Sequence, residues 1–334
     1  MRKLVAGLVA LTATLFTAAV FGQAYPRKPI RIVVPFSTGS LADDVARLIG
    51  PKLAEGLGQP VVVQNKAGAE GSLGAAEVAN ASADGYTLLL IGVGTLVIRP
   101  LLYKNLSYDP FKSFEHLSLL GTSPQILAAA TNFAPSTVTD LVAFAKANPG
   151  KVAYGSVGTG ISGDLNAVLL TNRTGIDMVH VRIGMTTYLN FLSLPYKGSA
   201  PTMTDMIGGH VNIAFASAPL ALPQVKGGRI KALAVGSARR ILQLPNTPTV
   251  AETVPGFMAA SALGILAPAG TPREIMARLH GELMKALADP QVRGKFAGQG
   301  FDAGGSTQKE FLASMRAESH KLAKVIRDNQ IRVE

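Results

Sequence analysis

The sequence predicts an α/β protein built from two similar lobes. From Ile30 onward, short runs of β-branched residues alternate with helical patterns, which is typical of α/β lobes built on mainly parallel or mixed sheets. A second series of the same kind begins near Ile126. The chain of 334 residues, nearly half of them apolar, is long enough for two domains with substantial cores.

The elements of both series follow from their hydrophobic periodicity. In the first series we expect strands at 30–34, 60–64 and 87–91 and helices at 41–57 and 71–81. In the second we expect strands at 152–154, 178–181, 211–215 and 230–235 and helices at 164–171 and 202–207.

Two amphipathic helices are expected in the C-terminal tail. Thr271 is predicted to cap the first, with Pro272 at its first position, and apolar residues then follow at i+4 spacing from Ile275 to Leu287. Thr307 and Glu310 predict a capping box for the last helix.

No linker rich in proline, serine or charge separates the two series, so we expect the chain to cross between lobes on extended segments. One lobe is predicted to combine 25–125 with 262–334, and the other to comprise 126–261. A clamshell fits this arrangement.

The first 24 residues have the order of a secretory signal peptide. Arg2 and Lys3 precede an uncharged apolar run at 4–20, and the small-residue pattern Gly22-Gln23-Ala24 follows. The alternative, a membrane anchor, is disfavoured because the run is short for a span. We therefore predict cleavage after Ala24 and a periplasmic location in a Gram-negative cell.

Composition excludes several functions. The chain has no cysteine, so disulfides and thiol catalysis are ruled out. Without the signal peptide, 30 basic residues (32 less Arg2 and Lys3) face 21 acidic ones, a net charge of +9 with neutral histidines. Dense Lys/Arg blocks and tryptophan are absent, so the charge suits small anions better than nucleic acid.

The loop 35–43 lies between a predicted strand and a predicted helix. Loop amides and a helix N-terminus in that position can hold a carboxylate or phosphate, so Phe36, Ser37, Thr38 and Gly39 are candidate ligand contacts. Asp43 is also a candidate, although a carboxylate beside an anion is unfavourable. The favoured alternative is that Asp43 pairs with Ser40 as a cap and orients the loop.

A second loop, 154–163, leaves a strand and opens another helix. Ser156, Gly158, Thr159 and Gly160 are candidate ligand contacts there, because a hydroxyl- and glycine-rich turn suits a small anion. The stretch 158–163 also satisfies G-x-G-x-x-G, with Asp177 about 20 residues after the first glycine, as a dinucleotide site requires. A nicotinamide enzyme is the disfavoured alternative, because an isolated glycine fingerprint is weak and the chain is expected to be exported.

Catalytic and metal-binding patterns are lacking. The five histidines show no H-E-x-x-H or similar metal spacing, and Gly-x-Ser-x-Gly is absent. We expect no enzyme activity, no metal and no cofactor.

With both loops placed, the chain resembles the Bug family of periplasmic receptors, the solute-binding components of tripartite tricarboxylate transporters. The matching stretches span the mature chain and include Tyr25-Pro26, Pro29–Phe36, Gly39, Asp43, Ala46-Arg47, Gly58–Val63, Asn65, Gly68, Gly71, Asp84–Leu88, Tyr154–Ser156, Tyr196–Pro201 and Ala267–Pro272. The resemblance implies a type II periplasmic-binding fold, with a small carboxylate enclosed between closing lobes and held at both loops. It also implies delivery to membrane permease subunits, and we expect a monomer; a sensor with a signalling partner is the alternative.

Three residues depart from the family pattern. Asp164 stands where the family often has histidine, Ala216 where an acidic residue is frequent, and Ala262 where an aromatic residue is frequent. Asp164 is a candidate ligand contact that disfavours a second ligand carboxylate or pairs with a ligand ammonium, or it is a helix-start residue that points to water. Organic acid is therefore the expected ligand class.

An apparent insertion at 182–194 is unusually apolar for a surface loop. A lid, a transporter contact and a self-association patch are possible roles. A tolerated extension folded on the second lobe is favoured over these.

Overall fold

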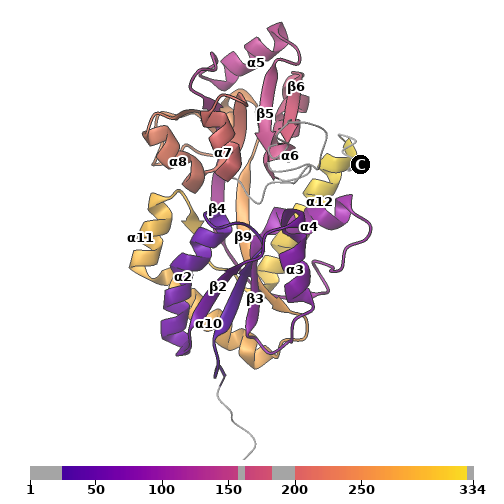
Figure 1. Ribbon diagram of the computed structural model, residues 1–334, viewed down its shortest axis with the longest axis vertical. Coiled ribbons are helices and arrows are strands. Elements are labelled where there is room, and N and C mark those ends of the chain that lie inside the picture. The colour runs from indigo at the N-terminus through magenta and orange to yellow at the C-terminus, as the bar shows by residue number, and fades with distance from the viewer. Residues whose placement is uncertain (1–24, 157–161, 183–199, 329–334) are drawn as a thin grey trace, which may run out of the picture.

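Two lobes lie one above the other along the longest axis of the molecule (Figure 1). The computed structural model describes residues 25–156, 162–182 and 200–328, and two long strands join the lobes. Among the helices of these residues, none is long and apolar enough to cross a membrane. The predicted signal peptide, 1–24, lies outside the described residues.

The first lobe is a mixed sheet with helices on both faces. Parallel strands β1, β2 and β3 are followed by antiparallel β9 and β4, with β10 paired to β4. The strands are β1 (Ile30–Val34), β2 (Val61–Asn65), β3 (Thr87–Gly92), β4 (Phe114–Ala130), β9 (Ala260–Pro268) and β10 (Asp302–Ala303). The helices are α2 (Leu41–Leu57), η2 (Ala69–Gly71), α3 (Ser72–Ala79), α4 (Val93–Leu102), α10 (Arg273–Ala288), α11 (Pro290–Gly298) and α12 (Gln308–Asp328).

Alternate residues of the central strands serve two cores in this lobe. Leu88 and Leu90 pack on the side of α2 and α10, whereas Leu89 and Ile91 pack on the side of α4 and α12. Successive side chains of a strand point to opposite faces, so a strand covered on both faces reads as a continuous apolar run. The run Leu88–Ile91 is such a strand.

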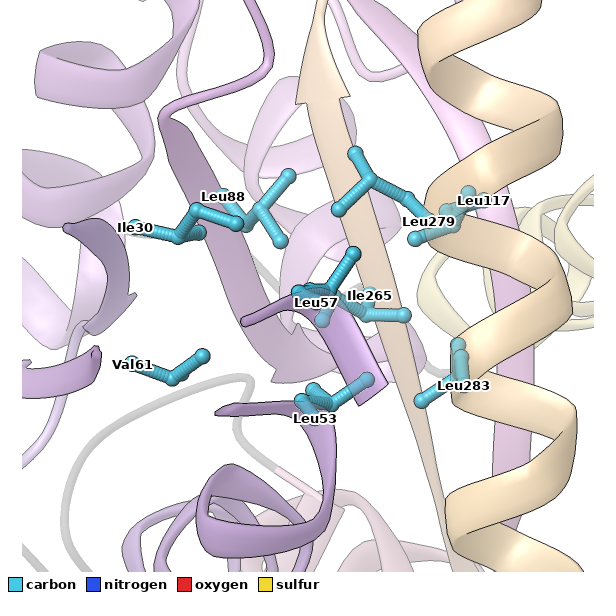
Figure 2. Close-up of a pocket in the computed structure, with 9 residues that line it drawn as sticks. All are labelled: Ile30, Leu53, Leu57, Val61, Leu88, Leu117, Ile265, Leu279 and Leu283. Atoms are coloured by element: carbon cyan, nitrogen blue, oxygen red, sulfur yellow. The ribbon is translucent and has the colours of Figure 1, made fainter. Parts of the chain in front are cut away.

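The core on the α2 and α10 side contains a small void (Figure 2). Its volume is about 10 Å³, and its lining is entirely aliphatic: Ile30, Leu53, Leu57, Val61, Leu88, Leu117, Ile265, Leu279 and Leu283. A space of this size holds at most about one water, which needs polar partners. The void is therefore a packing feature of the core and not a ligand site.

The second lobe is another mixed sheet, ordered β4, β7, β5, β6, with β8 also paired to β4. Its other strands are β5 (Val152–Ser156), β6 (Met178–Arg182), β7 (Ile213–Ser217) and β8 (Ile230–Val235). Its helices are α5 (Val138–Ala147), α6 (Ser162–Thr174), α7 (Ala200–Ile207), α8 (Ala218–Lys226) and α9 (Val250–Thr253). Both sheets are mixed rather than mainly parallel, because the crossing strands run antiparallel to their neighbours.

Strand β4 passes from one sheet to the other. Up to Pro124 it pairs with β9 of the first lobe, and from Gln125 onward it pairs with β7 and β8 of the second. The chain returns just before β9, where Ala259 bonds Gln125 and Gly236. The lobes are thus joined by extended chain. We keep the lobe boundaries at 125/126 and 261/262 as a proposal. The change in the pairing of β4, from β9 to β7 and β8, supports the first of them.

One expectation about a helix start needs correction. Thr271 does not cap α10: its buried hydroxyl donates to the Pro268 carbonyl at 2.7 Å, and Pro272 takes the cap position. Strand β4 begins at Phe114, and its pairing within the second lobe begins at Gln125, near the predicted start of the second series at Ile126. The capping box of Thr307 and Glu310 is confirmed by reciprocal bonds of 3.2 and 2.8 Å.

Candidate ligand-binding site

The strand registers place the starts of both candidate loops, at the ends of β1 and β5, near the crossing between the lobes. In the first lobe, the C-terminal end of β3 lies opposite Leu263, near the start of β9, and β1 runs parallel to β3. In the second lobe, the end of β7 lies opposite Gln125, and β5 runs parallel to β7. The C-terminal ends of β1 and β5, where the two candidate loops begin, therefore both point toward the crossing between the lobes. Ligands of α/β sheets commonly bind beyond such strand ends.

The turn after β1 is organised around the buried carboxylate of Asp43. Ser40 caps α2 by accepting a hydrogen bond from the Asp43 amide at 3.3 Å. The carboxylate in turn accepts three hydrogen bonds, each of 3.0 Å, from the main-chain amide of Gly39, the side-chain amide of Asn65 and the guanidinium of Arg47. The favoured prediction of a Ser40–Asp43 cap that orients the loop is confirmed, with Gly39 rather than Ser40 donating to the carboxylate.

Asp43 is held ionised by these partners. Burial by itself raises the pKa of its carboxyl, but the hydrogen bonds from Arg47, Gly39 and Asn65 outweigh burial, so the pKa is lowered overall. The neighbouring Asp44 is affected in the opposite sense, because burial and the charge of Asp43 raise its pKa. Both oxygens of Asp43 thus accept hydrogen bonds from residues of the turn and its neighbours.

Asn65 connects this turn to the next strand. It ends β2 opposite Val34, and its side chain donates to the Phe36 carbonyl at 3.0 Å as well as to Asp43. The Thr38 hydroxyl donates a hydrogen bond to the side-chain oxygen Oδ1 of Asn65 at 3.4 Å. Because parallel strands end at the same sheet edge, Asn65 is placed to fix the loop.

The predicted contacts of the first loop differ in exposure. Ser37 is half-buried, whereas Thr38 and Gly39 are exposed, and Gly39 has a φ of 78° that favours glycine. Phe36 is partly committed to packing, since its ring lies against Gly71. Ser37, Thr38 and Gly39 remain the candidates for direct contact.

In the second lobe, three buried residues, Tyr154, Ser156 and Asp164, form a cluster with the half-buried His180. The Asp164 carboxylate accepts the Tyr154 hydroxyl at 2.9 Å and lies 3.4 Å from His180 Nδ1. His180 Nε2 lies 2.7 Å from Ser156 Oγ, and its ring stacks on Tyr154 with centroids 4.6 Å apart. Asp164 starts the helix as expected, but at 2 % exposure it does not point to water, so that alternative is wrong.

Gly158, Thr159 and Gly160 lie outside the described residues, as does the insertion beyond Arg182. The structure therefore brings together Ser156 and Asp164 of the predicted second set. Gly163 is placed, and a methyl group there would meet the Phe215 carbonyl at 3.3 Å, which indicates close packing of α6 on β7.

A third polar group lies at the crossing itself. Gln125 is buried, and its side-chain amide donates to Ser261 at 2.7 Å and to Ser162 at 3.3 Å. The bonds tie the start of α6 to both crossing strands. Ala216 and Ala262 stand opposite Ile126 of β4 and Thr122 of β4, so both departures from the family pattern lie on strands at the crossing.

Sequence reasoning assigned no role to Asn65, Gln125 or His180. Asn65 follows an apolar run on β2, which is parallel to β1, and His180 follows one on β6, which is parallel to β5. A polar residue at this position, beside a strand that leads into a candidate loop, was the signal that could have found both. Gln125 gave no such signal, because the partners of a polar residue inside an apolar strand are known only once both crossing strands are placed.

A larger hollow of about 570 Å³ lies elsewhere, on the first lobe against α4 and α12. Its lining mixes aliphatic and aromatic side chains with serines, Lys104 and Asp109, and it contains none of the predicted site residues. It lies away from the crossing where the ends of β1 and β5 meet, so we do not assign the ligand to it.

The two-lobed fold and the paired strand-end turns define a solute-binding protein of the periplasmic type. The profile described as tripartite tricarboxylate transporter family receptor matches residues 45–331, and the chain belongs to this family. The predicted resemblance to Bug receptors is thereby confirmed.

Solved structures of relatives agree with this assignment. The periplasmic binding protein BugD is 31 % identical, with 93 % of this chain and 100 % of that chain covered and a TM-score of 0.84. Rpa4515 of R. palustris, solved with adipate, is 31 % identical over 92 % and 99 % of the two chains, with a TM-score of 0.85. MatC of Rhodopseudomonas palustris, solved with malate, is 28 % identical over 90 % and 100 %, with a TM-score of 0.81.

Proposed function

We propose that this protein is a periplasmic receptor that encloses a small organic acid between its lobes and performs no chemistry on it. The observation that carries the proposal is the convergence of the C-terminal ends of β1 and β5 on the crossing between the lobes. Family membership and the relatives that hold adipate and malate support a carboxylate as the ligand.

Closure of the lobes accounts for binding in this proposal. A ligand shifts an open and closed equilibrium only by as much as it prefers the closed form, so both turns must contribute contacts. We assign Ser37, Thr38 and Gly39 to one side and Ser156, with Gly158, Thr159 and Gly160, to the other. Asp43 and Asp164 position these groups.

Export and delivery complete the proposal. Residues 1–24 direct the chain to the periplasm and are removed after Ala24, and the closed receptor then docks on the permease subunits of a tripartite tricarboxylate transporter. Uptake of the bound acid by membrane vesicles that carry such a permease should require the receptor. Uptake that is unchanged without the receptor would contradict delivery.

The ligand class is tested by thermal unfolding of the mature chain with adipate, malate, succinate, glutamate, benzoate and NAD. A ligand that binds the native state raises the melting temperature by linkage, so we expect at least one acid to raise it. Stabilisation by NAD alone, with every acid inactive, would overturn the proposal in favour of a nucleotide enzyme.

Two variants test whether both turns bind. Ser37→Ala and Ser156→Ala should each weaken the affinity for the best acid about tenfold, the value of one hydrogen bond to a charged group. Ser107→Ala, at an exposed position of the first lobe, is the control and should leave affinity unchanged. Equal affinity in all three variants would exclude these serines from the site.

A further inference from the structure

The four residues that precede α3, segment 68–71, have an unusual backbone. All of them have positive φ angles: 145° at Gly68, 43° at Ala69, 51° at Glu70 and 93° at Gly71. Ala69 and Glu70 carry a Cβ, and such residues rarely adopt the left-handed region. A strained conformation persists only where its surroundings fix it, and strain of this kind gathers at ligand sites. Contacts from elsewhere in the fold must therefore hold segment 68–71 in place.

Arg99 of α4 supplies these contacts. Its guanidinium donates through Nη1 to the Glu70 carboxylate and through Nε to the Ser72 hydroxyl, the latter at 3.2 Å. The guanidinium carbon lies 3.9 Å from the centre of the Tyr103 ring, and this stacking fixes its plane. The side chains of Arg99 and Glu70 are only 7 % and 17 % exposed. One buried ion pair thus ties the strained segment and the first residue of α3 to α4.

The start of α3 in turn packs closely against the first candidate loop. A methyl group added to Gly74 would lie 2.8 Å from the Pro35 side chain and 3.0 Å from its Cα. A methyl group added to Gly71 would lie 3.3 Å from the Phe36 ring. Because these approaches leave almost no free space, a shift of α3 must also move Pro35 and Phe36. These two residues lead directly into the candidate contacts at 37–39.

We propose that Arg99 is a positioning residue for the ligand site of the first lobe. Through Glu70 and Ser72 it holds segment 68–71 and the start of α3 in the conformation that sets the position of residues 35–39. The inference rests on the proposed function and names a residue that determines its affinity. A buried ion pair is weak evidence of added stability, because apolar residues of similar volume often serve as well. Its role here is to fix a backbone conformation, and Arg99 itself does not contact the ligand.

Removal of the guanidinium should weaken binding. Arg99→Met keeps the length of the side chain but releases segment 68–71, so only a fraction of the molecules holds the turn in its binding conformation. The apparent Kd rises by the inverse of that fraction, and we expect a loss of affinity for the best acid of about tenfold. Calorimetry measures it, at a temperature at which circular dichroism shows the variant folded. Unchanged affinity in Arg99→Met would overturn the inference.

Two double variants separate positioning from charge. Arg99→Met combined with Glu70→Gly, and Arg99→Met combined with Glu70→Ala, both remove the whole ion pair. They differ only in the residue that must adopt a φ of 51°, which glycine does without strain and alanine does not. We expect the glycine variant to bind within about twofold of the wild type and the alanine variant about tenfold more weakly. Equal affinity of the two overturns the inference, and this comparison stands even where Arg99→Met alone does not fold.

Glu77 provides the control within α3. Its carboxylate also forms ion pairs, with Arg31 and, at 3.2 Å, with Lys66, but its backbone is helical. Glu77→Gln should therefore leave affinity unchanged. A loss as large as that of Arg99→Met would mean that any ion pair of α3 supports the turn, and the specific role of Arg99 would be refuted.

Hydrogen exchange without ligand separates failure of this inference from failure of the proposed function. The main-chain amides of residues 36–43 should exchange faster in Arg99→Met than in the wild type, because the turn has lost its support. The double variant with Glu70→Gly should restore the wild-type rate. Unchanged exchange in Arg99→Met overturns the inference even where acids bind. If no acid binds the wild-type chain, the proposed function fails, whereas faster exchange at 36–43 still shows that Arg99 positions the turn.

Discussion

The C-terminal ends of β1 and β5 occupy equivalent places in the two lobes, but the aspartates that follow them in the chain are held by different chemistry. Each strand end points to the crossing, and the next helix in each lobe has a buried aspartate in its first turn. Asp43 is bound by a main-chain amide, an amide side chain and a guanidinium. Asp164 is bound by a phenol and an imidazole.

The difference determines how far each aspartate depends on other elements of the fold. Gly39 and Arg47 lie within four residues of Asp43 along the chain, and Asn65 is the partner that comes from another strand. Tyr154 and His180, which contact Asp164, lie on β5 and β6. The first aspartate is therefore held mainly by local contacts, and the second by contacts between elements.

The comparison is tested most severely at Asp43. Asp43→Asn should lower the free energy of unfolding by about 2 kcal/mol at neutral pH, because buried donors lose a charged acceptor and Arg47 loses its counter-charge. Urea unfolding measures this. Asp44→Asn is the control and should stay within about 0.5 kcal/mol, since burial and the charge of Asp43 raise the pKa of Asp44 and outweigh its attraction to Arg47.

Unfolding at low pH tests the Asp43→Asn variant in a second way. The pKa of Asp43 is lowered in the folded state, so its contribution to stability is present above the unfolded pKa of about 3.9 and is lost as pH falls through the folded pKa. The gap between wild type and Asp43→Asn should therefore narrow below about pH 4. A gap that stays constant in acid would show that packing, not charge, holds this turn.

In the second lobe the expected effect is smaller. Tyr154→Phe removes one donor from the buried Asp164 carboxylate and keeps the ring on His180, so the free energy of unfolding should fall by about 1–2 kcal/mol. Tyr103→Phe, a half-buried tyrosine that stacks with Arg99, is the control. Equal stability of the two variants would mean that Asp164 does not depend on the phenol.

Whether an element or contact could be predicted from the sequence depends on how far apart in the chain the interacting residues lie. Local rules sufficed for the first turn, because Gly39, Ser40 and Asp43, which form the cap, lie within five consecutive residues. Hydrophobic runs likewise placed most strands, and the run at 230–235 was predicted with its observed limits.

Contacts between elements could not be read in this way. The bond from Asn65 to Asp43 and that from His180 to Ser156 join residues on different strands, and they exist only after the parallel registers are set. The double pairing of β4 was missed for the same reason, since an extended run does not reveal that its two halves have different partners. At Thr271 a local rule gave a wrong prediction: the capping pattern was present, but the hydroxyl donates to the Pro268 carbonyl instead of capping α10.

The smallest effect is expected from the main chain of the first turn. Gly39 has a φ of 78°, and a methyl group added to its Cα would have no heavy atom within 4 Å. Gly39→Ala should therefore cost about 1 kcal/mol through backbone strain alone. Gly39→Asn should recover part of this loss, because asparagine tolerates the left-handed region.

Gly281 provides the matched control, since it is equally open but lies inside α10. Alanine there removes the entropic cost of a helical glycine and should stabilise the fold by up to about 1 kcal/mol. Opposite signs at these two open glycines, measured by urea unfolding, would show that Gly39 is required for its conformation. Equal signs would mean that the turn relaxes to a conformation any residue adopts, and the bond from Gly39 to Asp43 would then no longer define the first lobe's scaffold.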